Sequence, residues 1–194
     1  MKRLGVFGGT FDPPHVGHLV TAINVLHDLR LDQVLLVVAN DPWQKAGLPV
    51  SPALDRLAMV EAAVADVAGL EASSIEIDRG GPSYTAETLA ELHLREPDAE
   101  LHLIMGSDAA HRLHSWERAE ELSDLATLVV VNRPGAQATA VPQGWKAQQV
   151  EVPRLEVSST DLRARVVDGR PLKWLVTEPV IHVISDRRLY AERR

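Results

Sequence analysis

Short apolar runs alternate with longer amphipathic stretches along most of this chain. The strand-like runs are residues 3–7, 34–38, 74–77, 101–105, 127–131 and 148–152. The sequences LLVV and LVVV contain no alternating polar residues, which is typical of strands covered on both faces. Strands that alternate with helical segments predict an α/β fold, with a largely parallel sheet and crossover helices.

Helical patterns occupy the segments between the strands, at residues 16–29, 52–67, 85–95 and 116–123. In the second helix the apolar positions recur near the 3.6-residue period, and they are Leu54, Leu57, Ala58, Val60 and Val64. A Ser-Ser-Thr-Asp start signal predicts another helix after Val157, and residues 178–186 predict a last short one. With no repeat and no convincing linker, we expect one domain over residues 1–194, with a C-terminal helical subregion of residues 157–194 packed on it as a small appendage.

Composition narrows the classes of protein that fit this pattern. The 194 residues are 45% apolar, enough for a substantial core, and the lack of cysteine excludes a disulfide framework, thiolate catalysis and cysteine-bound zinc. The apolar runs are far shorter than the roughly 20 residues of a membrane helix, so we expect a soluble, cytoplasmic protein without a membrane partner. A net charge of -7 argues against a nucleic-acid partner. A homo-oligomer stays open.

The segment GVFGGTFDPPHVGH follows the first strand and precedes the first helix. Ligands of open α/β sheets bind beyond the carboxyl ends of the strands. We expect the backbone to turn off the sheet at Gly8 and Gly9, where missing side chains let a phosphate approach backbone N–H groups. There is no GxGxxG, and no Lys-Ser or Lys-Thr follows, so a hydride-transfer or P-loop site is disfavoured.

His15 and His18 lie three residues apart at the predicted helix start, so both can face the same side. Imidazoles that are protonated or donate hydrogen bonds there would stabilise a phosphate whose negative charge grows during a reaction. Either histidine alone is as well explained by an exposed polar residue or a helix cap. A metal site is the weaker alternative, because no carboxylate joins the pair at ligand spacing.

Candidate ligand residues also follow the fourth strand. Gly106 permits close approach of a ligand, and the Asp108 carboxylate can accept hydrogen bonds from ribose hydroxyls, although Ser107 or Asp108 could simply cap a helix. Trp116 offers a flat ring for stacking on a pyridine, with a core tryptophan as the usual alternative.

Two predicted helix starts present uncovered N–H groups. Where a loop enters a helix at Ser83, Tyr84 and Thr85, these groups could bind a carboxylate, or Thr85 could cap the helix. The other start contains Ser158, Ser159, Thr160 and Arg163, for which capping alone would explain the hydroxyls.

Lys45 and Arg133 are candidate phosphate ligands near two of the predicted loops. A lysine would act as a point charge, and an arginine as a bidentate fork. Most such residues are solvated surface charges, which is the alternative for both.

The whole string GGTFDPPHVGH resembles the nucleotidylyltransferase signature, whose core is a His or Thr, any residue, then Gly-His. This resemblance implies a Rossmann-like fold and attack on a nucleotide α-phosphate with release of pyrophosphate. Further segments resemble the nicotinate (nicotinamide) mononucleotide adenylyltransferase family in the same order along the chain: GPSYTAETL at 81–89, IMGSD at 104–108, SW at 115–116, NRPG at 132–135 and VSSTDLR at 157–163.

The resemblance implies adenylyl transfer from ATP, accompanied by Mg²⁺, to nicotinate mononucleotide in NAD biosynthesis. It assigns catalysis to His15, His18, Lys45 and Arg163. It assigns ATP binding to Gly8, Gly9, Thr10, Phe11, His18, Gly106, Asp108, Arg133, Ser158, Ser159, Thr160 and Arg163. It assigns mononucleotide binding to Asn40, Lys45, Ser83, Tyr84, Thr85 and Trp116, and no metal ligand to the protein.

One loop departs from the family pattern. Many members have Pro-Pro-His before the basic residue, whereas this chain has Asp41, Pro42, Trp43 and Gln44 before Lys45. Two other functions stay open: a phosphopantetheine adenylyltransferase, which shares the first motif, and a module that senses ATP or NAD without turnover.

Overall fold

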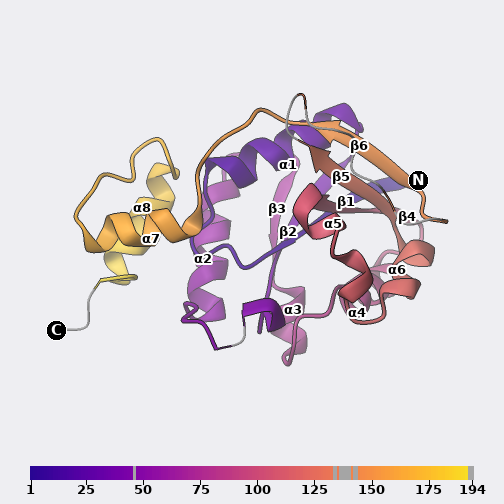
Figure 1. The fold of residues 1–194 in the computed structure, drawn as a ribbon, viewed down its shortest axis with the longest axis horizontal. Helices are drawn as coiled ribbons and strands as arrows, with labels where there is room; N and C mark the ends of the chain where they lie inside the picture. The colour runs from indigo at the N-terminus through magenta and orange to yellow at the C-terminus, as the bar shows by residue number, and fades with distance from the viewer. Residues whose placement is uncertain (46, 133–134, 136–140, 142–143, 192–194) are drawn as a thin grey trace.

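A six-stranded parallel sheet forms the centre of the computed structural model, which describes residues 1–45, 47–132, 135, 141 and 144–191. The strand order is β3-β2-β1-β4-β5-β6 (Figure 1). The strands are β1 (Lys2–Gly9), β2 (Gln33–Val38), β3 (Leu70–Ser73), β4 (Ala99–Gly106), β5 (Thr127–Asn132) and β6 (Ala147–Glu151). The predicted α/β fold with a parallel sheet is confirmed.

Helices cover both faces of this sheet. They are α1 (Val16–Asp28), α2 (Ala53–Val64), α3 (Ile75–Arg79), α4 (Thr85–Arg95), α5 (Ser107–Ala110), α6 (Ala119–Leu125), α7 (Ser159–Val167) and α8 (Glu178–Asp186), with short 3-10 turns η1 (Trp43–Lys45) and η2 (Leu113–Ser115). Within the described residues, no helix is long and apolar enough to cross a membrane.

Alternate residues of the strands enter two separate cores. On β2, Val34 and Leu36 pack with α1 and α2, while Leu35 and Val37 pack with α3 to α6 on the opposite face. Both faces of this strand are therefore buried, as its continuous apolar run predicts.

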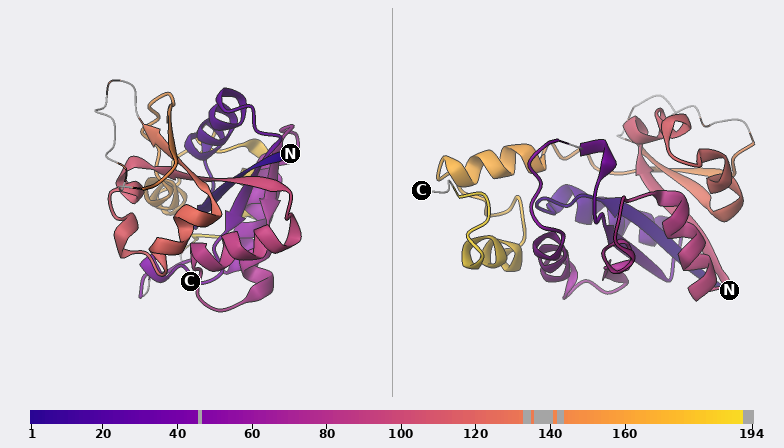
Figure 2. Two further views of the ribbon diagram at one scale, coloured as in Figure 1. Left: turned by 90° about the vertical axis from the view of Figure 1, so that its right-hand side faces the viewer. Right: turned by 90° about the horizontal axis from the view of Figure 1, so that it is seen from below.

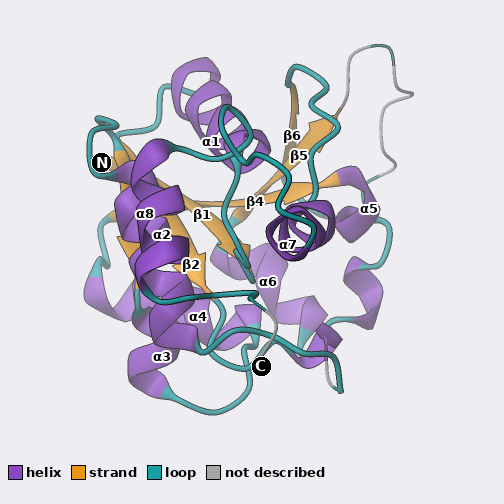
Figure 3. Ribbon diagram, turned by 90° about the vertical axis from the view of Figure 1, so that its left-hand side faces the viewer, coloured by secondary structure: helices purple, strands orange, loops and turns teal. Residues whose placement is uncertain are grey.

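The C-terminal helices join the first of these cores. Leu162 of α7 and Val180 and Ile184 of α8 belong to the same buried cluster as Met59 of α2. Figures 2 and 3 show α7 and α8 at one end of the molecule, with α8 lying along α2.

Two predicted elements differ from the structure. In the segment 74–77, expected as a strand, Ser74 is the N-cap of α3 and residues 75–77 lie in that helix, and the strand is the preceding β3. So short an apolar alternation also fits a single helical turn, and pairing of Leu70 with Val34 selects the earlier residues for the sheet. The helix expected at 116–123 begins at Ala119, because Arg118 adopts a left-handed φ of 54° before it.

The buried face of α2 also differs from the predicted apolar stripe. Leu54 is 65% exposed, whereas Arg56 is only 1% exposed. The Arg56 guanidinium donates four hydrogen bonds to carbonyl oxygens, at 2.6–3.1 Å, and the acceptors are Thr10, Ala39, Asn40 and Ser51. A single buried side chain thus joins the segments that follow β1 and β2 to the start of α2.

Arg56→Met should lower the free energy of unfolding by about 3–5 kcal/mol, because it leaves several buried carbonyls without donors. Urea denaturation measures this change. The matched control is Arg95→Met, which removes an exposed ion pair with Glu91 and should cost less than about 1 kcal/mol. Equal losses in the two variants would contradict the role assigned to Arg56.

Candidate active site

The chain leaves β1 through a tight turn at Phe11 and Pro13. Gly8 and Gly9 are still part of the strand, so the turn expected at these glycines lies a few residues later, where Phe11 has a φ of 49° and the Asp12–Pro13 peptide is cis. The Phe11 ring is buried over Gly9, where a Cβ atom would lie 2.7 Å from it. Gly8 has open space around it, so a ligand can approach the strand end closely.

A cavity of about 230 Å³ opens beside this turn, at the carboxyl ends of β1 and β4. Nine of the residues expected to bind ligands line it: Gly8, Gly9, Thr10, Lys45, Ser83, Tyr84, Thr85, Gly106 and Trp116. Glu76 and Thr88 lie in the same wall. A site at the carboxyl edge of the sheet is where the sequence places it.

The two signature histidines stack against each other at the start of α1. Their ring centroids are 3.7 Å apart with an interplanar angle of 25°. His15 is the N-cap residue and is 9% exposed, so an exposed surface role does not describe it. The His15 backbone N–H donates to Nδ1 of His18 at 3.2 Å. Since Nδ1 accepts, the neutral His18 ring carries its proton on Nε2, which is left as a donor.

Burial keeps both imidazoles neutral near pH 7. It lowers the pKa of His15 to about 4. Burial also lowers the pKa of His18 well below its usual value, and the protonated form of His15 and the charge of Lys45 act in the same direction. Of the two forms expected from the sequence, the hydrogen-bonding imidazole is therefore the one present before ligands bind.

Lys45 and Arg163 come to the signature turn from two other segments. Burial lowers the pKa of Lys45, and the charge of Arg163 lowers it further. Arg163 Nη1 also donates to the Asp12 carbonyl at 2.8 Å. The four residues expected to be catalytic thus gather around the signature turn, within an electrostatic field that favours anions.

The loop that departs from the family pattern contributes directly to the cavity. Pro42 and Trp43 line it together with Lys45, and Trp43 is 38% exposed. Asn40 instead donates to the Gly81 carbonyl at 2.9 Å. Arg133, the other predicted phosphate ligand, lies outside the described residues.

Hydroxyl groups at the start of α7 have different partners. Ser158 Oγ accepts from the Asp161 N–H at 3.2 Å, so the capping alternative is correct for this residue. Ser159 Oγ donates to the Pro13 carbonyl at 2.9 Å, and Arg163 Nη2 donates to Thr160 Oγ1 at 3.4 Å. This helix start is therefore fastened to the signature turn.

The start of α4 is uncapped where it meets the cavity. Its N-cap residue Tyr84 makes no side-chain cap bond, and Thr85 lies inside the helix rather than at the N-cap. The Ser83 hydroxyl is buried without a hydrogen-bond partner among the described residues. Free N–H groups and an unused hydroxyl are what a bound carboxylate would require here.

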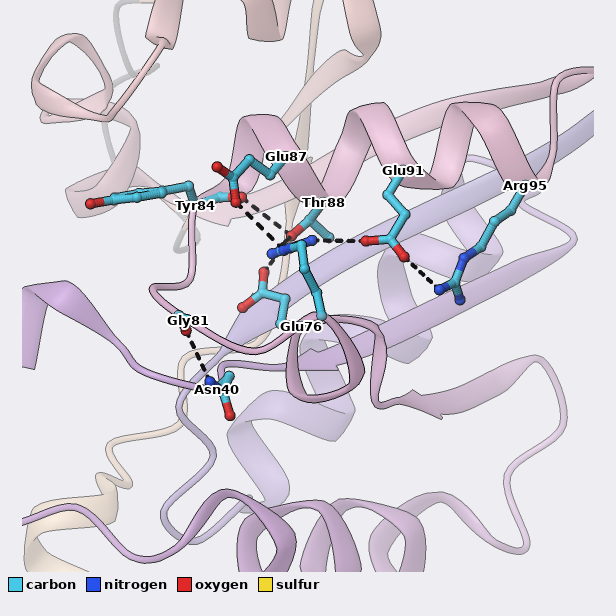
Figure 4. Close-up of polar contacts among 9 residues, drawn as sticks. Asn40, Glu76, Gly81, Tyr84, Glu87, Thr88, Glu91 and Arg95 are labelled. Atoms are coloured by element: carbon cyan, nitrogen blue, oxygen red, sulfur yellow. Dashed lines mark hydrogen bonds and ion pairs between the residues drawn. The ribbon is translucent and has the colours of Figure 1, made fainter.

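A polar network holds this helix start in place (Figure 4). The Thr88 hydroxyl donates to Glu76 at 2.6 Å and accepts from Arg79 Nη2 at 3.1 Å, and Arg79 Nη1 donates to Glu91 at 3.0 Å. The Ser83 N–H donates to the Asp41 carbonyl at 3.0 Å, tying the loop to the segment after β2. The sequence pattern does not identify Glu76, because residues 74–77 are interpreted as a strand, and it does not single out Arg79, which follows them.

Neither Ser107 nor Asp108 caps the helix that follows β4, and binding of a ribose by Asp108 stays a prediction. Gly106 is the N-cap of α5, with open space where a Cβ would lie, and neither it nor a neighbour makes a side-chain cap bond. Asp108 is exposed in the first turn of α5. Trp116 packs against the second core, as the core alternative expects, and it also lines the cavity, where stacking on a pyridine stays a prediction.

A stacked histidine pair, two cations and an uncapped helix start lie at the carboxyl edge of the parallel sheet, an arrangement suited to the phosphates of a nucleotide. Residues 6–165 match the cytidylyltransferase-like family. A Corynebacterium kroppenstedtii protein named "Probable nicotinate-nucleotide adenylyltransferase" is 45% identical over 191 residues, covering 97% of this chain and 90% of that protein.

Solved structures of the Plasmodium falciparum nicotinic acid mononucleotide adenylyltransferase share the fold. The complex with APC has a TM-score of 0.78 at 16% identity, and the complex with NaAD has a TM-score of 0.78 at 18% identity. Each alignment covers 98% of this chain and 98% of the other. The chain belongs to the cytidylyltransferase-like family and, within it, to the nicotinate-nucleotide adenylyltransferases.

The lowered pKa values predict how stability depends on pH. Between pH 6.5 and about 4, the unfolded chain binds protons at His15 and His18 that the folded protein excludes. The free energy of unfolding is therefore highest above pH 6.5. It decreases as the pH falls from 6.5 to about 4, by about 3 kcal/mol for His15. Chemical denaturation at pH 8, 6 and 5 should show a flatter dependence for the double variant His15→Asn/His18→Asn.

The control for this comparison is His182→Asn, since that imidazole is 68% exposed. It should leave the pH dependence of the wild type unchanged. A double variant with the full wild-type dependence would show that the histidine pair does not exclude protons.

Proposed function

We propose that this chain transfers the adenylyl group of ATP to nicotinate mononucleotide, giving nicotinate adenine dinucleotide and pyrophosphate. The observation that carries the proposal is one continuous site: donors and cations suited to phosphates lie at the signature turn, and an uncapped helix start lies in the adjoining cavity wall. The names of the relatives and of the structural neighbours supply the substrates.

In the proposed reaction, a phosphate oxygen of the mononucleotide attacks the α-phosphorus of ATP in line. The new P–O bond forms as the bond to the β-phosphate oxygen breaks, and pyrophosphate leaves with that electron pair. No protein nucleophile takes part. The protein contributes positioning and stabilisation of developing charge, through His18 Nε2–H, His15, Lys45 and Arg163.

The histidines change role when the phosphates bind. Negative charge near an imidazole favours its protonated form, so the phosphates oppose the effect of burial. In the neutral ring, the bond from the His15 N–H to Nδ1 leaves Nε2 as the donor; protonation would keep the Nε2 donor but would break this bond. We propose that ATP enters as its Mg²⁺ complex, with the ion carried by the phosphates of the substrate.

The mononucleotide is proposed to occupy the cavity between Trp116 and the start of α4. The positively charged pyridine ring would stack on the indole, and its carboxylate would accept from the N–H groups at Tyr84 and Thr85 and from the Ser83 hydroxyl. Recognition by N–H donors favours a carboxylate over an amide without a dedicated arginine. The residues proposed to bind ATP are Gly106, Asp108, Ser159, Thr160 and Arg163.

Pyrophosphate release tests the function directly. The purified chain with Mg–ATP is supplied separately with nicotinate mononucleotide, nicotinamide mononucleotide and phosphopantetheine. We expect the highest kcat/KM with nicotinate mononucleotide. Preference for phosphopantetheine would identify the rival transferase, and ATP binding without pyrophosphate from any acceptor would indicate a sensing module.

His18→Ala should lower kcat by about two to three orders of magnitude, as expected for loss of one donor to developing charge. Steady-state kinetics at saturating substrates measure the change. The matched control is His27→Ala, in the last turn of the same helix, where the side chain is 89% exposed and activity should be retained. Unchanged turnover in His18→Ala would contradict this role.

Trp116→Ala should mainly raise the KM for the mononucleotide, because stacking contributes to binding before and during the reaction. Its control is Trp145→Ala, since Trp145 packs against the same core but does not line the cavity. A fall in kcat with unchanged KM, or equal effects in the two variants, would rule out stacking as the function of Trp116.

A further inference from the structure

Asp12 is a buried carboxylate in the middle of the signature segment. It is 2% exposed and lies three residues before His15. One of its oxygens, Oδ2, accepts from the Ser51 N–H at 3.1 Å, and the other, Oδ1, accepts from the Tyr190 hydroxyl at 2.7 Å. A buried carboxylate needs such donors, so these two contacts determine where the turn lies.

The Tyr190 hydroxyl stays protonated and so remains a hydrogen-bond donor to this carboxylate. Burial and the nearby charge of Asp12 both raise its pKa far above the usual value, so the hydroxyl keeps its proton at any physiological pH. The hydroxyl also lies 3.6 Å from the sulfur of Met59 in α2. Its reach to Asp12 spans 178 residues of sequence, which makes it a contact between the two ends of the described chain.

Among the described residues, the Asp12–Tyr190 contact is one of four hydrogen bonds between the C-terminal subregion and the signature turn. Ser159 bonds the Pro13 carbonyl, Arg163 bonds the Asp12 carbonyl, and the Val16 N–H donates to the Leu175 carbonyl at 3.0 Å. Every residue of the turn that receives a contact lies within four positions of His15. Ser159 and Arg163 have expected ligand roles, and the Val16–Leu175 bond joins two backbone groups. Of the four bonds, only that of Tyr190 therefore joins two side chains without an expected ligand role.

We propose that Tyr190 is a positioning residue for adenylyl transfer: by holding the Asp12 carboxylate, its hydroxyl fixes the turn that carries His15 and His18. Its influence passes through Asp12 and not through substrate. Because reactive groups displaced by as little as 1 Å can lose about 100-fold in rate, a loosened turn lowers kcat more than it weakens binding.

Tyr190→Phe removes the hydroxyl and keeps the ring, so it isolates the bond to Asp12. The matched control is Arg187→Gln, because Arg187 fastens the same helix end to α2 through Asp55 at 2.6 Å without touching the signature turn. Two measurements are made on both variants. The first is kcat and KM for nicotinate mononucleotide and Mg–ATP, which rests on the proposed function.

The second measurement needs no substrate. The nitrogen resonances of the His18 imidazole report the bond from the His15 N–H to Nδ1, which depends on the geometry of the turn. They are recorded by NMR on the unliganded protein. The thermal midpoint of each variant is recorded as well, so that loss of folded protein is corrected for.

We expect Tyr190→Phe to lower kcat by about 10- to 100-fold with both KM values within about twofold, and to shift the His18 resonances. Arg187→Gln should behave as the wild type in both measurements. Wild-type kcat and wild-type resonances in Tyr190→Phe would overturn the proposal, as would an Arg187→Gln variant with the same defects. If the wild type releases no pyrophosphate, the proposed function fails, and the resonances alone decide the role of Tyr190.

Discussion

The hydrogen bonds of the buried Arg56 guanidinium are the constraint on which the site depends. Parallel strands present their carboxyl ends at one edge of the sheet, but the loops that leave this edge have no ladder partners of their own. Arg56 satisfies the carbonyls of Thr10, Ala39 and Asn40 from inside the protein. The segments after β1 and β2 are thereby held at one spacing, with the cavity and Lys45 beside them.

The signature turn is also constrained by the C-terminal subregion. Apolar residues of α7 and α8 belong to the core that contains α1 and α2, and the subregion makes hydrogen bonds to the turn between Asp12 and Val16 through Ser159, Arg163, Leu175 and Tyr190. A subregion that looks like an appendage in the sequence therefore forms part of the scaffold of the site. Rigid support of this kind suits a reaction in which the protein contributes positioning and charge instead of a nucleophile.

Much of this arrangement could be predicted from the sequence because it depends on local pattern. Periodicity and spacing predict the strands other than β3, the helices α1, α2, α4, α7 and α8, and a common side for His15 and His18. Short elements could not be predicted, since α3 becomes helical only because β3 takes the place beside β2. Long-range polar contacts could not be predicted from local pattern either. The buried Arg56 of α2 has its acceptors on other segments, and Tyr190 lies 178 residues from Asp12.

In the proposed reaction, the adenylyl group passes directly from ATP to the mononucleotide, without a covalent enzyme intermediate. The configuration at the transferred phosphorus tests it most directly. The chain is supplied with one diastereomer of ATP that carries sulfur at the α-phosphorus, together with nicotinate mononucleotide, and the configuration of the dinucleotide product is determined. A single in-line displacement predicts inversion. Retention would contradict the account, because it requires two displacements through a covalently modified enzyme.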